Sequence, residues 1–492
     1  MKNKKKLKAS VCIIGGGVAG LTIAKEIARA NDCIIIEVGS NGALGDRTNL
    51  KWYVEERDYT EIKGDKTYRP ELSWVKILGG GCEAWEGYTP RMVENDFKLK
   101  TNFNVARDWP ISYQELESYY AEAERFLGVS GCADNPSDSF RSSSFPLPPF
   151  EFDIYEREIT SRVPYLNWHH VPQARNSLPY YGRMACNNIG TCNQCPTQAR
   201  WSPSAQLLPE IYLHPRINLM TETQAVELIV DEDNLVTRVK VFSKKEGFFY
   251  IETERVILSA GNVETVRLLL TSTNTKNKNG LLNNNGLLGK GFMDHPALRI
   301  TAEVPWGFKS QLQTNILASC HDYRKYDIET GAWGFLINLN SRKRGKLWVA
   351  AHMEMPPEDS NSITLSQDKK DYLGRPFASV KVAADWSGYS QTKRKIIQVL
   401  ENICASVGGV NSSIDPLQLW ACHPMGGTPM STCEESGVVD QNLMAWESKN
   451  IYILSLGVFP TGAAVNPTLT LLALTFRLRD HILRNDNRPI EL

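Results

Sequence analysis

The sequence has no excess of charge of either sign and no unbroken apolar stretch of membrane-spanning length. Its 55 lysines and arginines balance 55 aspartates and glutamates over 492 residues. A basic surface is the usual footprint of a nucleic-acid or anionic-membrane partner, so the composition supports neither. Residues 450–476 carry no charge, but Gly457, Pro460, Gly462 and Pro467 would break a spanning helix. We expect a buried strand, loop and helix there, and no membrane association.

A recognisable targeting segment is also missing. Lysines precede the apolar run of residues 11–14, but three glycines interrupt that run, no small-residue cleavage site follows and no Arg-Arg pair is present. We interpret the lysines as a solvated leader to the first strand. The 11 cysteines are an odd number and are scattered along the chain, which is typical of reduced thiols. These features predict a cytoplasmic protein.

The N-terminal residues read as a strand, a turn and a helix. Residues 9–14 form an apolar β run, a glycine-rich turn follows, residues 21–30 show helical spacing and residues 33–37 form a second buried strand. Strand–turn–helix units recur at residues 256–270 and 451–483. The sequence therefore predicts an α/β protein with a Rossmann-like nucleotide-binding domain that is assembled from discontinuous segments.

The pattern between residues 300 and 415 is different. Alternating apolar and polar residues there predict an antiparallel sheet, and residues 392–405 predict an amphipathic helix. We therefore expect a second domain with a mostly antiparallel sheet flanked by helices. The predicted nucleotide-binding domain comprises residues 1–100, 200–297 and 415–492, and the predicted substrate-binding domain comprises residues 101–199 and 298–414.

The first turn carries a dinucleotide-binding fingerprint. Gly15, Gly17 and Gly20 stand between strand and helix, and Glu37 follows Gly17 by twenty residues. The first glycine allows the tight turn, the second lets the backbone approach a pyrophosphate, and the third lets the helix pack on the strand. The helix N-terminus attracts phosphate, and Glu37 can accept hydrogen bonds from ribose hydroxyls. This fingerprint does not distinguish FAD from NAD.

Further motifs follow in a characteristic order. The segment 79–91 reads GGGCEAWEGYTPR, residues 108–113 read DWPISY, residues 423–428 read HPMGGT and residues 466–470 read NPTLT. Together these motifs resemble the glucose–methanol–choline (GMC) oxidoreductases over essentially the whole chain, with pyranose and glycoside oxidases and flavoprotein sugar dehydrogenases nearest in appearance. The resemblance implies FAD as the cofactor and oxidation of an alcohol to a carbonyl by hydride transfer to the flavin.

The resemblance also assigns site residues. His423 matches the family's active-site histidine and Asn466 matches its partner. Two departures stand out: Ala84 replaces the histidine that links flavin covalently in some pyranose oxidases, and Pro429 replaces the usual arginine after Gly-Gly-Thr. We therefore expect non-covalent FAD. The predicted cofactor-binding residues are Gly15, Gly17, Val18, Ala19, Gly20, Glu37, Gly80, Gly81, Trp85, Gly87, Val226, Ala260, Gly261, Gly457, Pro467 and Thr468.

The residues alone leave alternatives open for the two predicted catalytic side chains. Alcohol oxidation requires the hydroxyl proton to leave, and a neutral imidazole in the apolar surroundings of His423 can accept it. The same histidine could instead hold a loop. Asn466 directly precedes Pro467, a favourable first helical residue, so it could simply cap a helix. His295, in the segment FMDHP, we interpret as structural.

Metal binding has one ambiguous candidate. Cys186, Cys192 and Cys195 resemble the cysteine-rich loop of sugar dehydrogenases with an iron–sulfur cluster, but Ala185 occupies the place of an expected ligand. Reduced thiols in a packed loop are the alternative. The adjacent pair His169 and His170 has no third ligand at a suitable spacing. We therefore predict no metal.

The sequence thus predicts an FAD-dependent enzyme that oxidises an alcohol group of a sugar, glycoside or related polyol, with oxygen or another acceptor reoxidising the flavin. His423 would be the base and Asn466 would orient the hydroxyl. Two alternatives remain: a lyase with a redox-silent FAD, as in hydroxynitrile lyases, and an iron–sulfur-containing dehydrogenase subunit. A homo-oligomer or a small accessory subunit is possible. Trp333, Phe335, Trp348 and Trp386 could stack on a sugar ring or pack in the core.

Overall fold

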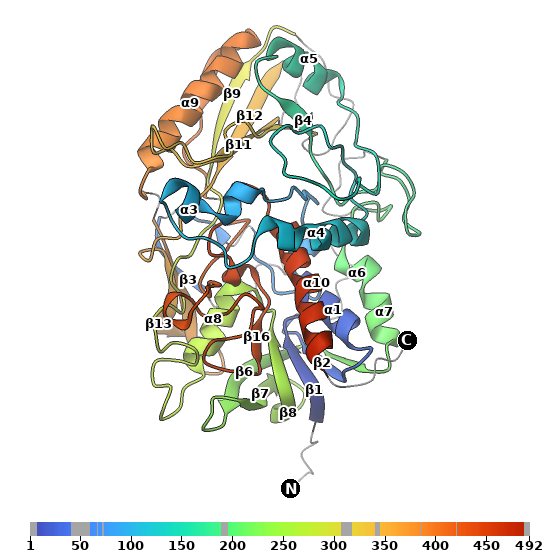
Figure 1. Ribbon diagram of the computed structural model, residues 1–492, viewed down its shortest axis with the longest axis vertical. Coiled ribbons are helices and arrows are strands. Elements are labelled where there is room, and N and C mark those ends of the chain that lie inside the picture. The colour runs from blue at the N-terminus through green and yellow to red at the C-terminus, as the bar shows by residue number, and fades with distance from the viewer. Residues whose placement is uncertain are drawn as a thin grey trace.

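The computed structural model of the protein describes residues 7–40, 60–65, 67–70, 73–187, 195–306, 317–339, 345–383, 385–419 and 421–486 (Figure 1). Within these residues the chain forms three sheets and nine α-helices. The predicted leader of residues 1–6 and Cys192 lie outside them.

A seven-stranded sheet lies in the lower part of the molecule in Figure 1. Its strands are β1 (Leu7–Ile14), β2 (Cys33–Ile36), β5 (Ile217–Met220), β6 (Thr223–Val230), β7 (Val236–Ser243), β8 (Gly247–Leu258) and β16 (Ile451–Ile453). The order is β5-β2-β1-β8-β7-β6, with β16 also paired to β8. β5, β2, β1, β8 and β16 pair in parallel, whereas β6 and β7 pair antiparallel. Distant segments thus form one Rossmann-like sheet, as predicted.

A six-stranded antiparallel sheet forms the upper part of Figure 1. Its strands, in spatial order, are β15 (Val410–Ile414), β9 (Ala297–Glu303), β12 (Lys346–Met353), β11 (Phe335–Leu339), β10 (Ala318–Cys320) and β4 (Trp168–His170). α9 (Tyr389–Ser406) packs on β9 and β12 through the apolar face that its spacing predicts. This arrangement confirms a mainly antiparallel second sheet flanked by a helix.

The predicted antiparallel region is nevertheless not one sheet. β13 (Ser362–Lys370) and β14 (Pro376–Val382) form a hairpin, and β14 pairs in parallel with β3 (Thr60–Gly64). This three-stranded sheet packs on α8 (Gly261–Thr271) rather than joining the upper sheet. Alternation of apolar residues specifies a half-buried strand but not which neighbour it pairs with. The predicted domain division itself stays a prediction.

Helices connect the two main sheets. α1 (Val18–Ile27) packs on α10 (Thr468–Asn485), and α10 packs on α4 (Tyr113–Leu127), which lies between the sheets in Figure 1. The remaining α-helices are α3 (Leu99–Phe103), α5 (Ile154–Arg162), α6 (Pro203–Gln206) and α7 (Leu208–Leu213). β16, the segment after it and α10 form the strand, loop and helix predicted for residues 450–476.

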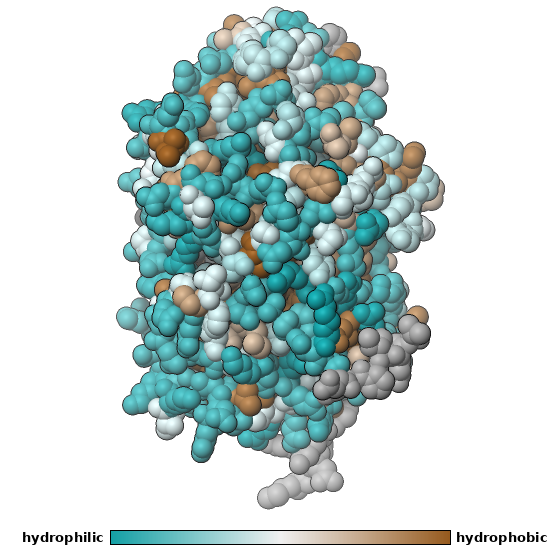
Figure 2. All heavy atoms as spheres, in the orientation of Figure 1, coloured by the Kyte–Doolittle hydropathy of each residue, from teal (hydrophilic) through white to brown (hydrophobic). Residues whose placement is uncertain are grey.

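The molecular surface is mainly polar on the face shown in Figure 2, where apolar side chains occur in small separate groups. Among the described residues, no helix combines the length and the apolarity that crossing a bilayer requires.

A buried ion network fastens the segment after the GGGCEAWEG motif to α4. Arg91 donates to both carboxylate oxygens of Glu124 at 2.8 and 2.9 Å and to Glu117 at 2.9 Å. Arg91 is 4% exposed and Glu124 is 1% exposed. Because carboxylates removed from water need compensating donors, the network depends on Arg91.

Replacing Arg91 therefore leaves buried Glu117 without its cation and leaves Glu124 with Arg141 alone. We expect Arg91→Met to lower the free energy of unfolding by about 3–5 kcal/mol. Arg162→Met is the matched control, because Arg162 pairs with Glu158 on an exposed helix surface and should cost less than about 1 kcal/mol. Urea unfolding monitored by circular dichroism measures both. Equal costs for the two variants would contradict a structural role of the network.

Candidate active site

The glycine-rich turn has the geometry that the fingerprint predicts. Gly15 has a φ of +111°, and a Cβ there would lie 2.4 Å from the carbonyl oxygen of Ser259. A Cβ on Gly20 would lie 2.0 Å from the carbonyl oxygen of Gly15, so helix and strand approach too closely for any side chain. Beside Gly17, by contrast, a Cβ would meet no atom within 4 Å. The turn is therefore tight on one side and open on the other.

Glu37 supports this turn. Its two carboxylate oxygens accept the N–H groups of Gly16 and Gly39, each at 2.6 Å, and the residue is buried. These contacts fix the carboxylate at the wall of a cavity that begins at the turn. The predicted contact of Glu37 with a ribose stays a prediction.

This first cavity brings together segments that are far apart in the sequence. The predicted residues that line it are Gly15, Gly17, Val18, Ala19, Glu37, Gly80, Gly81, Ala260 and Gly261. The N-cap residues of α1 and α8, Gly17 and Ala260, make no side-chain cap hydrogen bond, and both residues line the cavity, so each helix presents its N-terminus to the cavity wall. Open space beside Gly17 and Gly81 lets a ligand contact the backbone. The residues present therefore fit a pyrophosphate-containing dinucleotide.

Other predicted cofactor residues lie outside the lining of this cavity. Gly20 packs under the turn; Trp85 donates to the carbonyl of Trp201 at 2.9 Å; and Gly87 accepts the N–H of Ala174 at 2.7 Å. Ala225 rather than Val226 lines the cavity. Gly457, Pro467 and Thr468 do not line it, although Leu456 and Leu471 beside them do. Whether these residues contact the cofactor stays a prediction.

Sequence reasoning missed the charged part of this lining. Lys76 pairs with Glu264 at 2.8 Å, and Arg267 pairs with Asp371 at 2.8 Å. Burial raises the pKa of Glu264, but Lys76 and Arg267 outweigh it and lower that pKa to about 2. Lys76, Glu264, Arg267 and Arg375 all line the cavity. No local pattern marks these residues, because the paired side chains Lys76 and Glu264 are 188 positions apart.

His423 and Asn466 lie together, as the resemblance implies. The side-chain amide of Asn466 is 2.9 Å from Nε2 of His423. Asn466 does not cap the following helix, since Pro467 occupies the N-cap of α10 and no side chain caps it. The amide is therefore directed to the histidine, and the helix-capping alternative is wrong.

The hydrogen bonds determine which nitrogen of His423 carries hydrogen. A carbonyl oxygen can only accept, so Nε2 of His295 donates to the carbonyl of Ala463 at 2.8 Å. Burial lowers the pKa of His295 to about 4, and the neutral ring then has a lone pair at Nδ1. Nδ1 of His423, at 3.0 Å, must donate to it. Nε2 of neutral His423 is thus unprotonated and accepts the amide of Asn466.

The protonation state of His423 follows from its surroundings. Burial, together with His295 and His352, holds the pKa of His423 well below its usual value. The imidazole is therefore neutral at physiological pH and has a basic nitrogen at Nε2. This arrangement can accept a proton from a bound hydroxyl group.

A buried carboxylate joins the two histidine segments. Oδ1 of Asp294 accepts the backbone N–H of His295 at 2.8 Å and that of His423 at 3.0 Å. Tyr68 donates its hydroxyl to Oδ2 at 2.8 Å. Burial raises the pKa of Asp294 to about 6 in spite of these donors. The interpretation of His295 as structural is thus incomplete, since its ring contacts the candidate base.

A small second cavity has Asn466 in its wall. Its wall includes Tyr88, His169, Asn338 and His321. His169 and His321 are both buried, with ring centroids 4.3 Å apart. The four aromatic residues considered for sugar stacking line neither cavity. Trp333, Phe335 and Trp386 are buried in the core.

The cysteine-rich loop is described only in part. Sγ of Cys195 accepts the N–H of Arg200 at 3.5 Å, and an Arg175 guanidinium N–H reaches Sγ of Cys186 at 3.7 Å. Cys192 lies outside the described residues, so the predicted cluster alternative remains open.

Comparison with known proteins identifies the family. Two family models, both described as GMC oxidoreductase, match residues 166–297 and 357–475, together about half of the chain. The fructose dehydrogenase large subunit of Gluconobacter japonicus is 26% identical over 97% of this chain and 98% of its own length. The 2-methyl-1,2-propanediol dehydrogenase of Mycolicibacterium austroafricanum is 27% identical, over 83% of this chain and 80% of its own length.

A solved structure shares the fold. Pyridoxine 4-oxidase superimposes with a TM-score of 0.67 at 15% identity and covers 97% of this chain and 100% of its own. His423 and Asn466 lie within the second matched segment. The chain therefore belongs to the GMC oxidoreductase family and is an FAD-dependent oxidoreductase that acts on CH–OH groups.

Proposed function

We propose that this enzyme oxidises an alcohol group of a sugar, glycoside or related polyol to a carbonyl, with His423 as the base and Asn466 as the residue that orients the hydroxyl. The observation that carries the proposal is the unprotonated Nε2 of His423, held 2.9 Å from the amide of Asn466. Asn466 lines the second cavity, and Pro424, next to His423, lines the first. A hydroxyl group bound there would donate its proton to Nε2 and accept a hydrogen bond from the amide.

FAD would be held by the first cavity. The N-termini of α1 and α8 and the open backbone at Gly17 and Gly81 would receive its phosphates and the adjoining groups. When bound, FAD supplies the acceptor for the hydride that leaves the alcohol carbon. Ala84 has no nucleophilic side chain, which supports non-covalent binding.

The substrate class is supported by the relatives and by the few polar groups in the wall of the second cavity. The names of two relatives denote dehydrogenases of fructose and of a propanediol, both of which are polyhydroxylated. Buried polar groups bind hydroxyls well and disfavour an apolar alcohol, which leaves them unpaired. His169, His321 and Asn338 provide such groups at the cavity wall.

For the electron acceptor and the partners we propose only a class. Oxygen or another acceptor would reoxidise the flavin, and a small accessory subunit is supported by the relative named a large subunit. A homo-oligomer and a cytoplasmic location remain proposals, as does the domain division given above.

A panel of sugars, glycosides and alcohols with a dye acceptor tests the activity, and stopped-flow mixing with oxygen tests the acceptor. Failure of every alcohol to bleach the flavin would favour the lyase alternative.

The role of His423 can be tested by removing the base. We expect His423→Ala to lower kcat/KM by roughly 10²–10⁴-fold, because the hydroxyl proton then has no acceptor, while the FAD absorbance stays normal. His481→Ala is a control on the half-buried side of α10, where the ring contacts Tyr452. Initial rates with the best substrate of the panel measure both variants. Undiminished turnover in His423→Ala would refute the proposal.

The hydrogen-bond chain predicts that His295 is a positioning residue. His295→Leu removes the acceptor for Nδ1–H of His423, and we expect kcat to fall roughly 10²-fold with little change in KM. His295→Asn retains an acceptor oxygen near Nδ1 and should recover most of the rate. Equal rates for the Leu and Asn variants would show that His295 only fills space.

In the wild type, the low pKa of His423 keeps the base unprotonated, so kcat/KM should stay flat from about pH 8 through 6.5 and fall only at lower pH.

Substitutions at Gly17 and Gly20 should have different effects, on FAD affinity and on folding respectively. A methyl group at Gly17 meets no protein atom, so Gly17→Ala should fold normally but bind FAD at least roughly tenfold more weakly. Gly20→Ala should lose folding and FAD together, because its Cβ overlaps the carbonyl of Gly15. Thermal unfolding of the apoprotein and fluorescence titration with FAD separate the two effects. Normal FAD affinity in Gly17→Ala would contradict this placement of the cofactor.

A further inference from the structure

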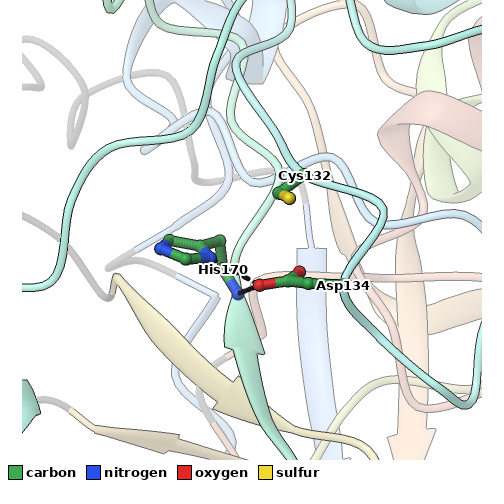
Figure 3. Close-up of side chains that lie close together, drawn as sticks. All are labelled: Cys132, Asp134 and His170. Carbon is green, nitrogen blue, oxygen red and sulfur yellow. Dashed lines mark hydrogen bonds and ion pairs between the residues drawn. The ribbon is translucent and has the colours of Figure 1, made fainter.

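Three potential metal ligands converge at the edge of the six-stranded sheet, away from both cavities' linings (Figure 3). Cys132 and Asp134 come from the loop that follows α4, and His170 ends the edge strand β4. Side chains alternate along a strand, so buried His169 contributes to the second cavity while His170 takes the opposite side. His169 and His170 therefore do not bind together. The residues beside His170 are Asp134 and Cys132, which lie 36 and 38 positions earlier in the chain.

The three donor atoms are close enough to share one ion. Sγ of Cys132, a carboxylate oxygen of Asp134 and a ring nitrogen of His170 all lie within 4.8 Å of one another. Nδ1 of His170 is 2.5 Å from Oδ2 of Asp134. The ring of His170 stacks on Phe152 with centroids 4.2 Å apart, which holds the imidazole plane while its Nδ1 faces the carboxylate. Figure 3 shows the sulfur and the carboxylate on the same side of the ring.

We propose that Cys132, Asp134 and His170 form a binding site for a zinc-type divalent ion. One thiolate, one imidazole and one carboxylate are the donors that Zn²⁺ accepts in protein sites with three protein ligands. Mg²⁺ and Ca²⁺ prefer oxygen ligands throughout, so the sulfur and nitrogen donors select against them. The His170 and Asp134 side chains are 21% and 30% exposed, which leaves room for water as a fourth ligand.

Binding needs adjustments of roughly 1 Å, because a tetrahedral site places sulfur roughly 3.6 Å from nitrogen and oxygen, whereas the three donor atoms lie within 4.8 Å of one another. Zinc holds sulfur at about 2.3 Å and nitrogen and oxygen at about 2.0–2.2 Å, so a tetrahedral site places nitrogen and oxygen roughly 3.3 Å apart. The contact between His170 and Asp134 must therefore open by a little under 1 Å from its 2.5 Å. Asp134 is the most exposed of the three ligands and lies on a loop, so its side chain can move. The thiol of Cys132 releases its proton to solvent on binding.

The site connects to the second cavity through the next residue. The side-chain amide of Asn135 is 3.1 Å from Nδ1 of His321, and its oxygen accepts the N–H of Ser137 at 3.0 Å. The amide nitrogen therefore faces His321, which lines the second cavity. An ion that fixes Asp134 to β4 would also fix this part of the cavity wall. Binding of the ion itself does not depend on the proposed enzymatic function.

Zinc binding to the FAD-loaded full chain tests the proposal. After treatment with a chelator, we expect titration calorimetry with Zn²⁺ to give one site with a Kd below about 1 µM. Cys132→Ser and Asp134→Asn should each weaken it at least about tenfold. Asp134→Asn alters an exposed side chain and keeps its shape, so it tests the site without threatening the fold. Co²⁺ should give a thiolate charge-transfer band in the difference spectrum, and Cys132→Ser should abolish that band.

Two controls separate this site from other thiols. Cys433→Ser removes an exposed thiol elsewhere and should leave the affinity unchanged. Cys186→Ser tests the cysteine-rich loop. Loss of zinc binding in Cys186→Ser with retention in Cys132→Ser would assign the ion to that loop and overturn the proposal. Absence of any binding to the wild type, or wild-type affinity in both Cys132→Ser and Asp134→Asn, would also overturn it.

Discussion

The candidate active site depends on one buried carboxylate. Asp294 accepts the backbone N–H groups of His295 and His423, which belong to segments 128 positions apart, and it receives the hydroxyl of Tyr68. Asp294 holds these two segments through their backbone N–H groups and does not occupy their side chains. This carboxylate clamp therefore lets the imidazole rings of His295 and His423 contact each other. The hydrogen-bond chain from Ala463 through His295 to His423 and Asn466 then has a single consistent direction. Without the clamp, neither the contact between the rings nor the position of the unprotonated Nε2 of His423 would be fixed.

Burial decides the chemistry that this chain of contacts can perform. The low pKa values of His295 and His423 keep both rings neutral, because a charged imidazole would lose its hydration in this site. A neutral ring has one donor and one acceptor, so the carbonyl of Ala463 sets the orientation of the whole chain. A base of this kind is available over a wide pH range. The same burial lowers the basicity of the ring.

The two main sheets provide different parts of the site. The ends of β1 and β8 in the seven-stranded sheet bring the glycine turn and α8 to the first cavity. The six-stranded sheet provides β4, β10 and β11 at the second cavity, and Asn466, just before α10, lies at its wall. The two cavities therefore draw on different sheets, and Pro424, next to His423, lines the first whereas Asn466 lines the second. The site arises where the sheets meet, which explains why its residues come from many segments of the chain.

The sequence alone determined the features that are local. The glycines at 15, 17 and 20, the strand–helix units and the amphipathic α9 follow from spacing and from steric limits within a few residues. His423 and Asn466 were found through motifs that resemble a family. The tertiary structure decided which strands pair, and so it divided β13 and β14 from the upper sheet. It also decided the contacts of His295 with His423, of Lys76 with Glu264 and of Cys132 with His170. Such contacts join residues far apart in the chain, and no local periodicity specifies which distant side chain will fill the space beside a given one.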